Sequence, residues 1–332
     1  MASHSYAATF VRYIDTDTYS EVMHRTACFF LLLLLPSYLF CADSIAPLVG
    51  YKKVMELNGD SAGGMIMPTD IAIGNDQRVY IVDSGNNRIL VYANNGSYLF
   101  SFGSKGNGNQ QLNSPVGITT TGDGRVLVAD RGNNRIQIFN SEGSFLKSIP
   151  TIVGKSTVTP VDVAMDHNDK RILVTASGPH HRILVFNNKG EITGVWGKPG
   201  NNQGEFRYPA TIAVSNEHET YVVDVFNTRV QVLDQKGKFL VSVGSWGVSP
   251  GHLFRPKGVA IENDGQILVS DSYLGVVQLY NSDTRFHAVL GINGEIARFD
   301  TPAGMIVDKQ NRVYIAEVMS NRVTVLKPVK TK

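Results

Sequence analysis

The stretch VYIVDSGNNRILVY (residues 79–92) returns almost letter for letter as VLVADRGNNRIQIF (residues 126–139). In each copy, two apolar runs rich in β-branched residues flank a polar turn that ends in an arginine. Apolar runs that alternate around such a Gly- and Asn-containing turn predict a β-hairpin. The same unit recurs, with more substitutions, four further times along the chain.

Each copy opens with a proline before a short apolar run, and successive prolines lie 45 to 49 residues apart. These prolines are Pro68, Pro115, Pro160, Pro209, Pro256 and Pro302. A period near 45 with four strand signals per repeat is typical of a propeller blade. The last repeat lacks a fourth strand after Arg322, whereas residues 51–57 form an unassigned strand before the first proline. We therefore predict an all-β fold, a six-bladed propeller of four-stranded antiparallel blades whose N-terminal strand completes the last blade and closes the ring.

The pattern Pro-x-Gly/Asp-Ile/Val-Ala, followed by Val-x-Val-x-Asp-x-x-Asn-x-Arg-Ile-x-Val-Phe, resembles the NHL repeat from about residue 50 to residue 328. Repeats one, two and four match closely. Repeat three has Ser177 for the usual aspartate and His181 for the usual asparagine, repeat five has Val276 for the arginine, and repeat six has Glu317 for the aspartate. The resemblance implies a six-bladed ring, but such a ring hosts many functions.

Composition narrows the class of protein. The 332 residues are 42% apolar and carry a formal net charge of +2, as in an ordinary globular chain. A nucleic-acid surface would need a basic stripe, so no nucleic-acid partner is expected.

The first residues predict export. Residues 27–40, ACFFLLLLLPSYLF, form an apolar run that is too short to span a bilayer and is typical of a signal peptide. His24 and Arg25 precede it, and the acidic residues further upstream indicate that Met23 is the true start. The prediction divides the chain into a signal segment (1–42), the propeller (43–328) and a basic tail (329–332).

This segment also holds both cysteines, Cys28 and Cys41, so the propeller itself has no disulfide. The expected location is periplasmic, cell-envelope or extracellular. Two alternatives would tether the protein to a membrane: an uncleaved N-terminal helix, or lipidation of Cys41.

Repeated acidic and basic residues are interpreted as structural. Short acidic side chains at strand ends accept N–H groups of turns, and an arginine can fork onto a nearby carboxylate or carbonyl. The members of this motif are Asp83, Asp130, Asp224 and Asp271, with Arg88, Arg135, Arg182, Arg229 and Arg322. Because chemistry happens at one place, departures from the repeat are more informative.

One departure is acidic. The second residue after each proline is Gly in three repeats and Thr211 in another, but Asp70 and Asp162 in the remaining two. Two carboxylates near a channel mouth could hold a divalent cation such as calcium. The alternative is that each aspartate bonds its own turn.

Histidine positions bear on other metals. The adjacent His180 and His181 could bind a metal or lie in a solvated turn, and the chain lacks zinc-site spacing. Related six-bladed rings include a zinc-dependent amidating lyase and calcium-dependent lactonases. A resemblance to the lyase would imply histidine directly after the repeat proline. The residues found there are Thr69, Val116, Val161, Ala210, Lys257 and Ala303.

Another departure is aromatic and basic. The loops before the prolines and the turns between second and third strands are expected on one face of the ring. In repeats three to five they carry Trp196, Arg207, Tyr208, Phe226, Trp246, His252, Arg255 and Tyr273. Aromatic residues with arginine are typical of protein-binding hot spots. The alternative is that several of these rings pack between blades.

These observations favour an exported, non-enzymatic scaffold without a cofactor, which binds a protein or an envelope polymer through this face. The competing hypothesis is a metal-dependent, lactonase-like or lyase-like enzyme with Asp70 and Asp162 among its ligands. A third is a structural spacer in an envelope complex.

Overall fold

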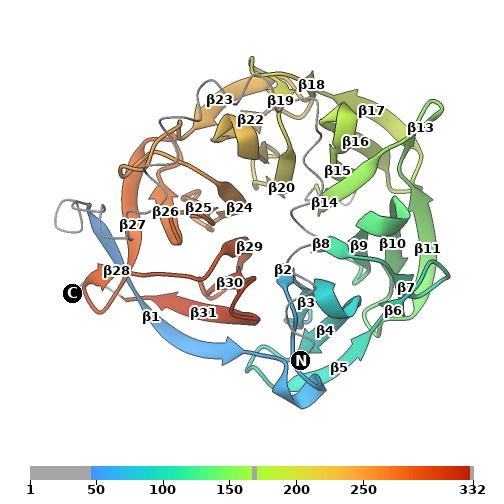
Figure 1. Cartoon of the computed structure of the whole chain (residues 1–332), viewed down its shortest axis with the longest axis horizontal. Helices are drawn as coiled ribbons and strands as arrows, with labels where there is room; N and C mark the ends of the chain where they lie inside the picture. Colours follow the sequence, from blue (N-terminus) through green and yellow to red (C-terminus); the bar gives the residue numbers. More distant parts are fainter. Residues whose placement is uncertain (1–45, 167–169, 330–332) are drawn as a thin grey trace, which may run out of the picture. The chain divides into compact units, whose positions relative to one another are not determined.

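The computed structural model describes residues 46–166 and 170–329, which form a ring of β-sheets (Figure 1). Within these ranges the regular structure consists of strands and short 3-10 turns, and no helix is long and apolar enough to cross a membrane. The first strand of each repeat lies near the centre of the ring, and each of these strands neighbours the next until the last meets the first. They are β2 (Pro68–Ile73), β8 (Pro115–Thr120), β14 (Thr159–Met165), β20 (Pro209–Val214), β24 (Pro256–Ile261) and β29 (Pro302–Val307).

Four repeats form separate four-stranded antiparallel blades, as predicted. In each, the strands are hydrogen-bonded in chain order from the centre outward. The first blade adds β3 (Val79–Asp83), β4 (Arg88–Tyr92) and β5 (Tyr98–Phe102) to β2. The second adds β9 (Val126–Asp130), β10 (Arg135–Phe139) and β11 (Phe145–Pro150) to β8. The third adds β15 (Arg171–Ser177), β16 (Arg182–Asn187) and β17 (Ile192–Trp196) to β14. The fourth adds β21 (Thr220–Asp224), β22 (Arg229–Leu233) and β23 (Phe239–Val243) to β20.

The last two repeats do not separate as expected, because β1 (Leu48–Leu57) pairs along both of its edges. It runs antiparallel to β31 (Arg322–Pro328), in the place predicted for the missing strand, and parallel to β27 (Phe286–Ile292). The result is one nine-stranded sheet in the order β24-β25-β26-β27-β1-β31-β30-β29, with β28 paired to β27. Its remaining strands are β25 (Ile267–Asp271), β26 (Val276–Tyr280), β28 (Glu295–Ile296) and β30 (Val313–Glu317).

Short two-stranded ribbons lie within the long loops that lead from one repeat to the next. Two are parallel and one is antiparallel. They are β6 (Ser104–Lys105) with β7 (Gln111–Leu112), β18 (Lys198–Pro199) with β19 (Glu205–Phe206), and β12 (Ile152–Val153) with β13 (Ser156–Thr157).

Asparagine at the end of the repeated turn links neighbouring repeats. Asn87 adopts a left-handed conformation (φ 56°), which asparagine tolerates better than most residues. Its Oδ1 accepts the N–H of Ser114 in the next repeat at 2.8 Å. In the last repeat, Asn321 accepts the N–H of Met67 in the first repeat at 2.9 Å. The same contact therefore crosses the point where the ring closes.

The apolar core lies between adjacent sheets. At the closure, Leu57 of β1 packs in one buried cluster with Ile81 and Leu90 of the first repeat and with Tyr314 and Val325 of the last. The ends of the chain are thus joined by packing as well as by pairing of strands.

Candidate functional site

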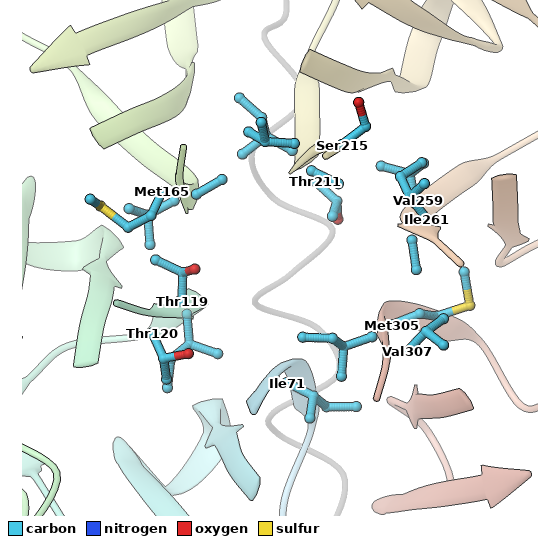
Figure 2. Close-up of a pocket in the computed structure, with 18 of the residues that line it drawn as sticks. Ile71, Thr119, Thr120, Met165, Thr211, Ser215, Val259, Ile261, Met305 and Val307 are labelled. Carbon is cyan, nitrogen blue, oxygen red and sulfur yellow. The ribbon is translucent and has the colours of Figure 1, made fainter. Parts of the chain in front are cut away.

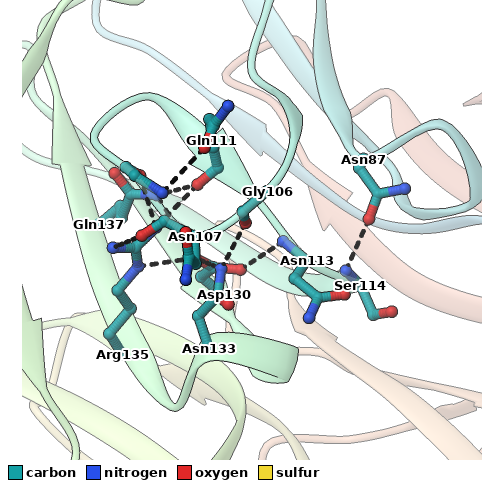
Figure 3. Close-up of polar contacts among 11 residues, drawn as sticks. Asn87, Gly106, Asn107, Gln111, Asn113, Ser114, Asp130, Asn133, Arg135 and Gln137 are labelled. Carbon is teal, nitrogen blue, oxygen red and sulfur yellow. Dashed lines mark hydrogen bonds and ion pairs between the residues drawn. The ribbon is translucent and has the colours of Figure 1, made fainter.

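The repeated Asp–Arg motif fastens the loop before each proline to its own blade (Figure 3). Asp130 is fully buried, and its Oδ1 accepts the N–H of Asn113 at 2.7 Å. Its Oδ2 accepts Asn133 Nδ2 and Arg135 Nε, both at 2.8 Å. The guanidinium of Arg135 also donates to three loop carbonyls, among them that of Gln111. These hydrogen bonds therefore all hold the loop to its blade.

Other copies repeat these contacts with substitutions. Asp83 pairs with Arg88 at 2.7 Å and Asp224 pairs with Arg229 at 3.0 Å. Glu317 stands in for aspartate and pairs with Arg322 at 2.8 Å.

Two repeats lack the ion pair. Asp271 accepts the N–H groups of Phe254 and Arg255 with no arginine beside it, because Val276 occupies that position. In repeat three, Arg182 donates to the carbonyl of His180 at 3.2 Å.

Asp70 and Asp162 lie at the centre of the ring, and both are buried. Asp70 Oδ2 accepts the N–H of Ile118 in the next repeat at 2.9 Å. Asp162 Oδ2 accepts the N–H of Ile212 in its next repeat at 2.9 Å, and its Oδ1 accepts the N–H of Val163 at 2.7 Å. The two aspartates therefore tie the first strands of neighbouring repeats together across the throat of the ring.

Glycines leave the room that these carboxyl groups occupy. A Cβ on Gly117 would overlap Asp162 Oδ1 and would lie 2.6 Å from Asp162 Cα. A Cβ on Gly304 would overlap Asp70 Oδ1 and would lie 2.7 Å from Asp70 Cα. The alternation of Gly and Asp at the second position after the proline is thus a matter of steric fit between neighbouring first strands.

The two buried carboxyl groups affect each other's pKa. Burial raises the pKa of Asp70 to about 7, against the lowering effect of hydrogen bonds from the N–H of Ile118 and from Asp162. Burial, and then the charge of Asp70, raise the pKa of Asp162 well above its usual value. Both groups therefore hold a proton to higher pH than a free aspartate does.

A cavity of about 530 Å³ extends from the two aspartates to the turns between first and second strands (Figure 2). Its walls combine apolar side chains, such as Ile71, Val259 and Met305, with polar ones, among them the hydroxyl groups of Thr119 and Thr211. The charged residues of its lining are all acidic: Asp70, Asp162, Asp166 and Glu262. The cavity opens on the side opposite the loops before the prolines, so the two aspartates face away from those loops.

The donor set around Asp70 and Asp162 does not fit calcium well. Calcium takes about six to eight oxygen ligands, most of them carboxylates or carbonyls. The two carboxyl groups already accept backbone N–H groups, and burial raises the pKa of both, which favours their protonated forms. Within residues 46–166 and 170–329, no group of three or more His, Cys, Asp or Glu side chains is arranged to hold a metal.

Protonation of this pair makes stability depend on pH. An unfolded aspartate has a pKa near 4, so between about pH 4 and 7 the folded chain holds a proton that the unfolded chain has lost. The contribution of this pair to the free energy of unfolding should therefore be largest below pH 4 and should fall, by on the order of a few kcal/mol, between about pH 4 and 7. Asp70→Asn should remove this contribution to the slope in urea titrations at successive pH values, whereas the exposed Asp60→Asn should keep it. An unchanged slope in Asp70→Asn would contradict the raised pKa of the pair.

The opposite face is formed by the loops before the prolines together with the turns between second and third strands; we call it the loop face. Backbone hydrogen bonds join the two sets within a repeat. Phe226 N–H donates to the carbonyl of Arg207 at 3.0 Å, and Ser272 N–H donates to that of Arg255 at 2.9 Å. Both sets of loops therefore emerge together, as the sequence predicts.

A row of alternating cations and aromatic rings crosses the loop face of repeats four and five. Lys257 Nζ lies 5.8 Å from the ring centre of Tyr208, whose ring lies 5.6 Å from that of Phe226. Arg255 lies between the rings of Phe226 and Phe254, 5.5 Å from each, and Tyr273 packs on Phe254 at 4.4 Å. We call these residues the cation–aromatic row: Lys257, Tyr208, Phe226, Arg255, Phe254 and Tyr273.

Not every aromatic residue expected on this face joins the row. Trp196 packs between repeats, against Gly237 and in an apolar cluster with Phe206, and Arg171 lies over its ring. Trp246 is 67% exposed and lies earlier in the loop between β23 and β24 that also carries Phe254 and Arg255, where its backbone bridges to Leu253.

Two of the histidines singled out in the sequence, His252 and His181, make contacts within the fold. His252 sits in the same loop as Trp246, and its carbonyl accepts Gln278 Nε2. His181 takes the place of the linking asparagine: its Nδ1 accepts the N–H of Tyr208 at 3.3 Å. Burial, followed by the charge of Arg207, lowers the pKa of His181, so the imidazole stays neutral and able to accept.

Sequence reasoning named most of this face but passed over Lys257. The available signal was its singularity, because the equivalent positions of the other repeats hold uncharged residues. Phe254 was also missed, since nothing in the sequence shows that it meets Arg255.

Comparisons with known proteins support both the ring-shaped fold and its repeats. The family model for the NHL repeat matches residues 66–92 and 112–139. These two stretches are NHL repeats. This confirms the resemblance in repeats one and two. No curated protein matches the sequence.

Solved structures with the same fold include enzymes. A streptogramin B lyase structure has a TM-score of 0.58 at 13% identity, with 86% of this chain and 99% of that one covered. Virginiamycin B lyase from Staphylococcus aureus, in a catalytically inactive form with quinupristin, has a TM-score of 0.59 at 14% identity, covering 86% and 96%. A gluconolactonase from Xanthomonas campestris has a TM-score of 0.60 at 14% identity, covering 80% and 87%. At these identities the likeness concerns the fold alone.

Proposed function

We propose that this NHL-repeat chain is a non-catalytic binding module that holds a protein or an envelope polymer on its loop face. The cation–aromatic row is the observation that carries the proposal. Phe226 is 51% exposed and Tyr273 is 61% exposed, although large aromatic side chains usually find cover in a folded protein. Aromatic rings interleaved with arginine are the composition of interface hot spots.

Charge also supports a partner at this face. Arg207 and Arg255 are exposed, and neither forms an ion pair within the described residues. The arginines of the repeat motif, by contrast, are paired with buried carboxylates. Arginines that lack an anionic side chain nearby and lie beside exposed rings would gain contacts when a binding partner covers them.

The proposal includes the setting of the module. We count the nine-stranded sheet as two blades joined by β1, which gives a six-bladed ring. The apolar run at residues 27–40 is proposed to direct export to the periplasm, the cell envelope or the extracellular space, with Cys41 or an uncleaved helix as the means of anchoring. No nucleic acid and no cofactor is required.

The row can be tested by truncating its centre. Phe226→Ala combined with Arg255→Ala should weaken partner binding at least about tenfold, because hot-spot truncations cost about 2 kcal/mol or more. The assay immobilises the full-length protein and quantifies what it retains from extracts of the source cells. Leu240→Ala with Lys238→Ala, an apolar and basic pair at the outer strand of the same blade, is the matched control. Equal retention by both double variants, with unchanged melting temperatures, would remove the row as the binding site.

The competing enzyme hypothesis rests on the two buried aspartates with raised pKa values at the inner end of the cavity. Two adjacent carboxyl groups, one protonated and one not, are the donor and acceptor that general acid–base chemistry needs. Because the two carboxyl groups do not fit calcium well, a metal-independent form of this hypothesis is favoured. Asp70→Asn would abolish such an activity and would leave binding at the loop face unchanged.

A further inference from the structure

Lys257 is singular among the residues that follow the repeat prolines. It is the second residue of β24, at the end of that strand which adjoins the loop face, and the other repeats place Thr69 or small and apolar side chains there. We call these loop-face ends of the first strands the mouth. Its carbonyl accepts Thr211 Oγ1 at 2.6 Å, which fixes the strand against its neighbour. Its half-buried side chain lies along the ring of Tyr208. The ammonium group is therefore held at this mouth rather than free in solvent.

Other cations converge on Lys257. Arg255 stands two residues before it, and Arg131 belongs to the turn Arg131–Asn133 of the second repeat, across the ring (Figure 1). Burial, then the charges of Arg255 and Arg131, lower the pKa of Lys257. None of the three forms an ion pair within residues 46–166 and 170–329. A half-buried cation such as Lys257, repelled by neighbouring charges and without a counter-charge, is costly, and an anionic group placed beside it would offset that cost.

We infer that this mouth recognises a carboxylate on an acidic segment of a protein partner. Lys257 would take the carboxylate, with Arg255 of the same row beside it, and the rings of the cation–aromatic row would contact the side chains that flank it. The inference rests on the proposed function and specifies the chemistry of the partner at that site.

The arrangement favours an acidic peptide over a nucleic acid. Single-stranded nucleic acids are bound by a basic groove that follows the backbone and by ring faces on which bases stack. Here Arg255 already covers faces of Phe226 and Phe254, and Lys257 lies over Tyr208. The unpaired cations gather at one mouth rather than along a track, and the formal net charge of the chain is only +2.

The test uses fluorescence anisotropy with a labelled oligoglutamate peptide and an oligoglutamine peptide of equal length. The wild-type protein should bind oligoglutamate more tightly than oligoglutamine. Lys257→Met should weaken oligoglutamate binding about tenfold or more, as expected for loss of a charged hydrogen bond. Lys257→Arg, which keeps the charge, should retain most of it. Lys236→Met, in the turn between β22 and β23, is the matched control and should bind like wild type. Raised salt should reduce the difference between Lys257→Met and wild type.

Three results would overturn the inference. The first is equal binding of oligoglutamate by Lys257→Met and wild type, with melting curves that show both folded. The second is equal binding of the two peptides. The third is tighter binding of a labelled single-stranded oligothymidylate than of oligoglutamate, which would assign the mouth to nucleic acid. If Phe226→Ala with Arg255→Ala loses the partner while Lys257→Met keeps it, the proposed function stands and the carboxylate inference falls.

Discussion

A chain that begins at Asn58 is expected to lose cooperative folding. It would lack β1, which supplies the outer strand beside β31 and also pairs with β27. Burial of Tyr51 and Leu57 would be lost, along with the 2.9 Å hydrogen bond from the Tyr51 hydroxyl to Glu262 Oε1. Large buried side chains contribute about 1.5–3 kcal/mol each, and domains are stable by only about 5–15 kcal/mol. Two exposed strand edges would also promote aggregation.

Circular dichroism melting curves and light scattering measure this loss. A chain that begins at Ala46 is the control and should melt in one sharp transition. Adding a peptide of residues 46–57 to the shortened chain should restore part of that transition, because the strand refills its place. If the shortened chain melted like the control without the peptide, closure by β1 would not hold the ring together.

Gly117→Ala is expected to be a strongly damaging methyl addition in the throat. The added Cβ would meet Asp162 at both its carboxylate and its Cα, so rotation of the Asp162 side chain alone cannot relieve the contact. The first strands of repeats two and three would have to move apart, which would strain the hydrogen bond from Ile212 N–H to Asp162. Overpacking of this kind costs about 1–3 kcal/mol, and the lost hydrogen bond to a buried carboxyl group adds to it.

Urea unfolding of Gly117→Ala measures the cost. Gly194→Ala is the matched control, because its added Cβ would lie 3.7 Å from the nearest atoms, at ordinary contact distance. The control should keep nearly wild-type stability. Equal stability of the two variants would show that the first strands do not approach as closely as the structure places them.

The repeat made much of the architecture predictable from sequence. Alternating apolar runs and a turn ending in Asn-Arg define each hairpin, and the missing strand after Arg322 pointed to β1. The second pairing of β1, with β27, was not predictable, because strand edges on the outside of the ring carry no sequence signal for a parallel neighbour.

The site was harder to predict, because its parts come from repeats far apart in the chain. Asp70 and Asp162 stood out as departures from glycine, but their raised pKa values depend on burial in a throat that only the closed ring creates. Trp196 and Phe226 are equally aromatic in sequence. Packing against Gly237 covers the first, whereas the second meets Arg255 on the loop face.

Site-specific photo-crosslinking tests the central claim, that the loop face holds the partner, most directly. The full-length protein would carry p-benzoylphenylalanine at Tyr273 in one preparation and at Leu240, on outer strand β23, in another. Both positions are exposed. Irradiation in the source cells should yield a crosslinked partner from position 273 and none from position 240. Crosslinks from position 240 but not from position 273 would contradict the account.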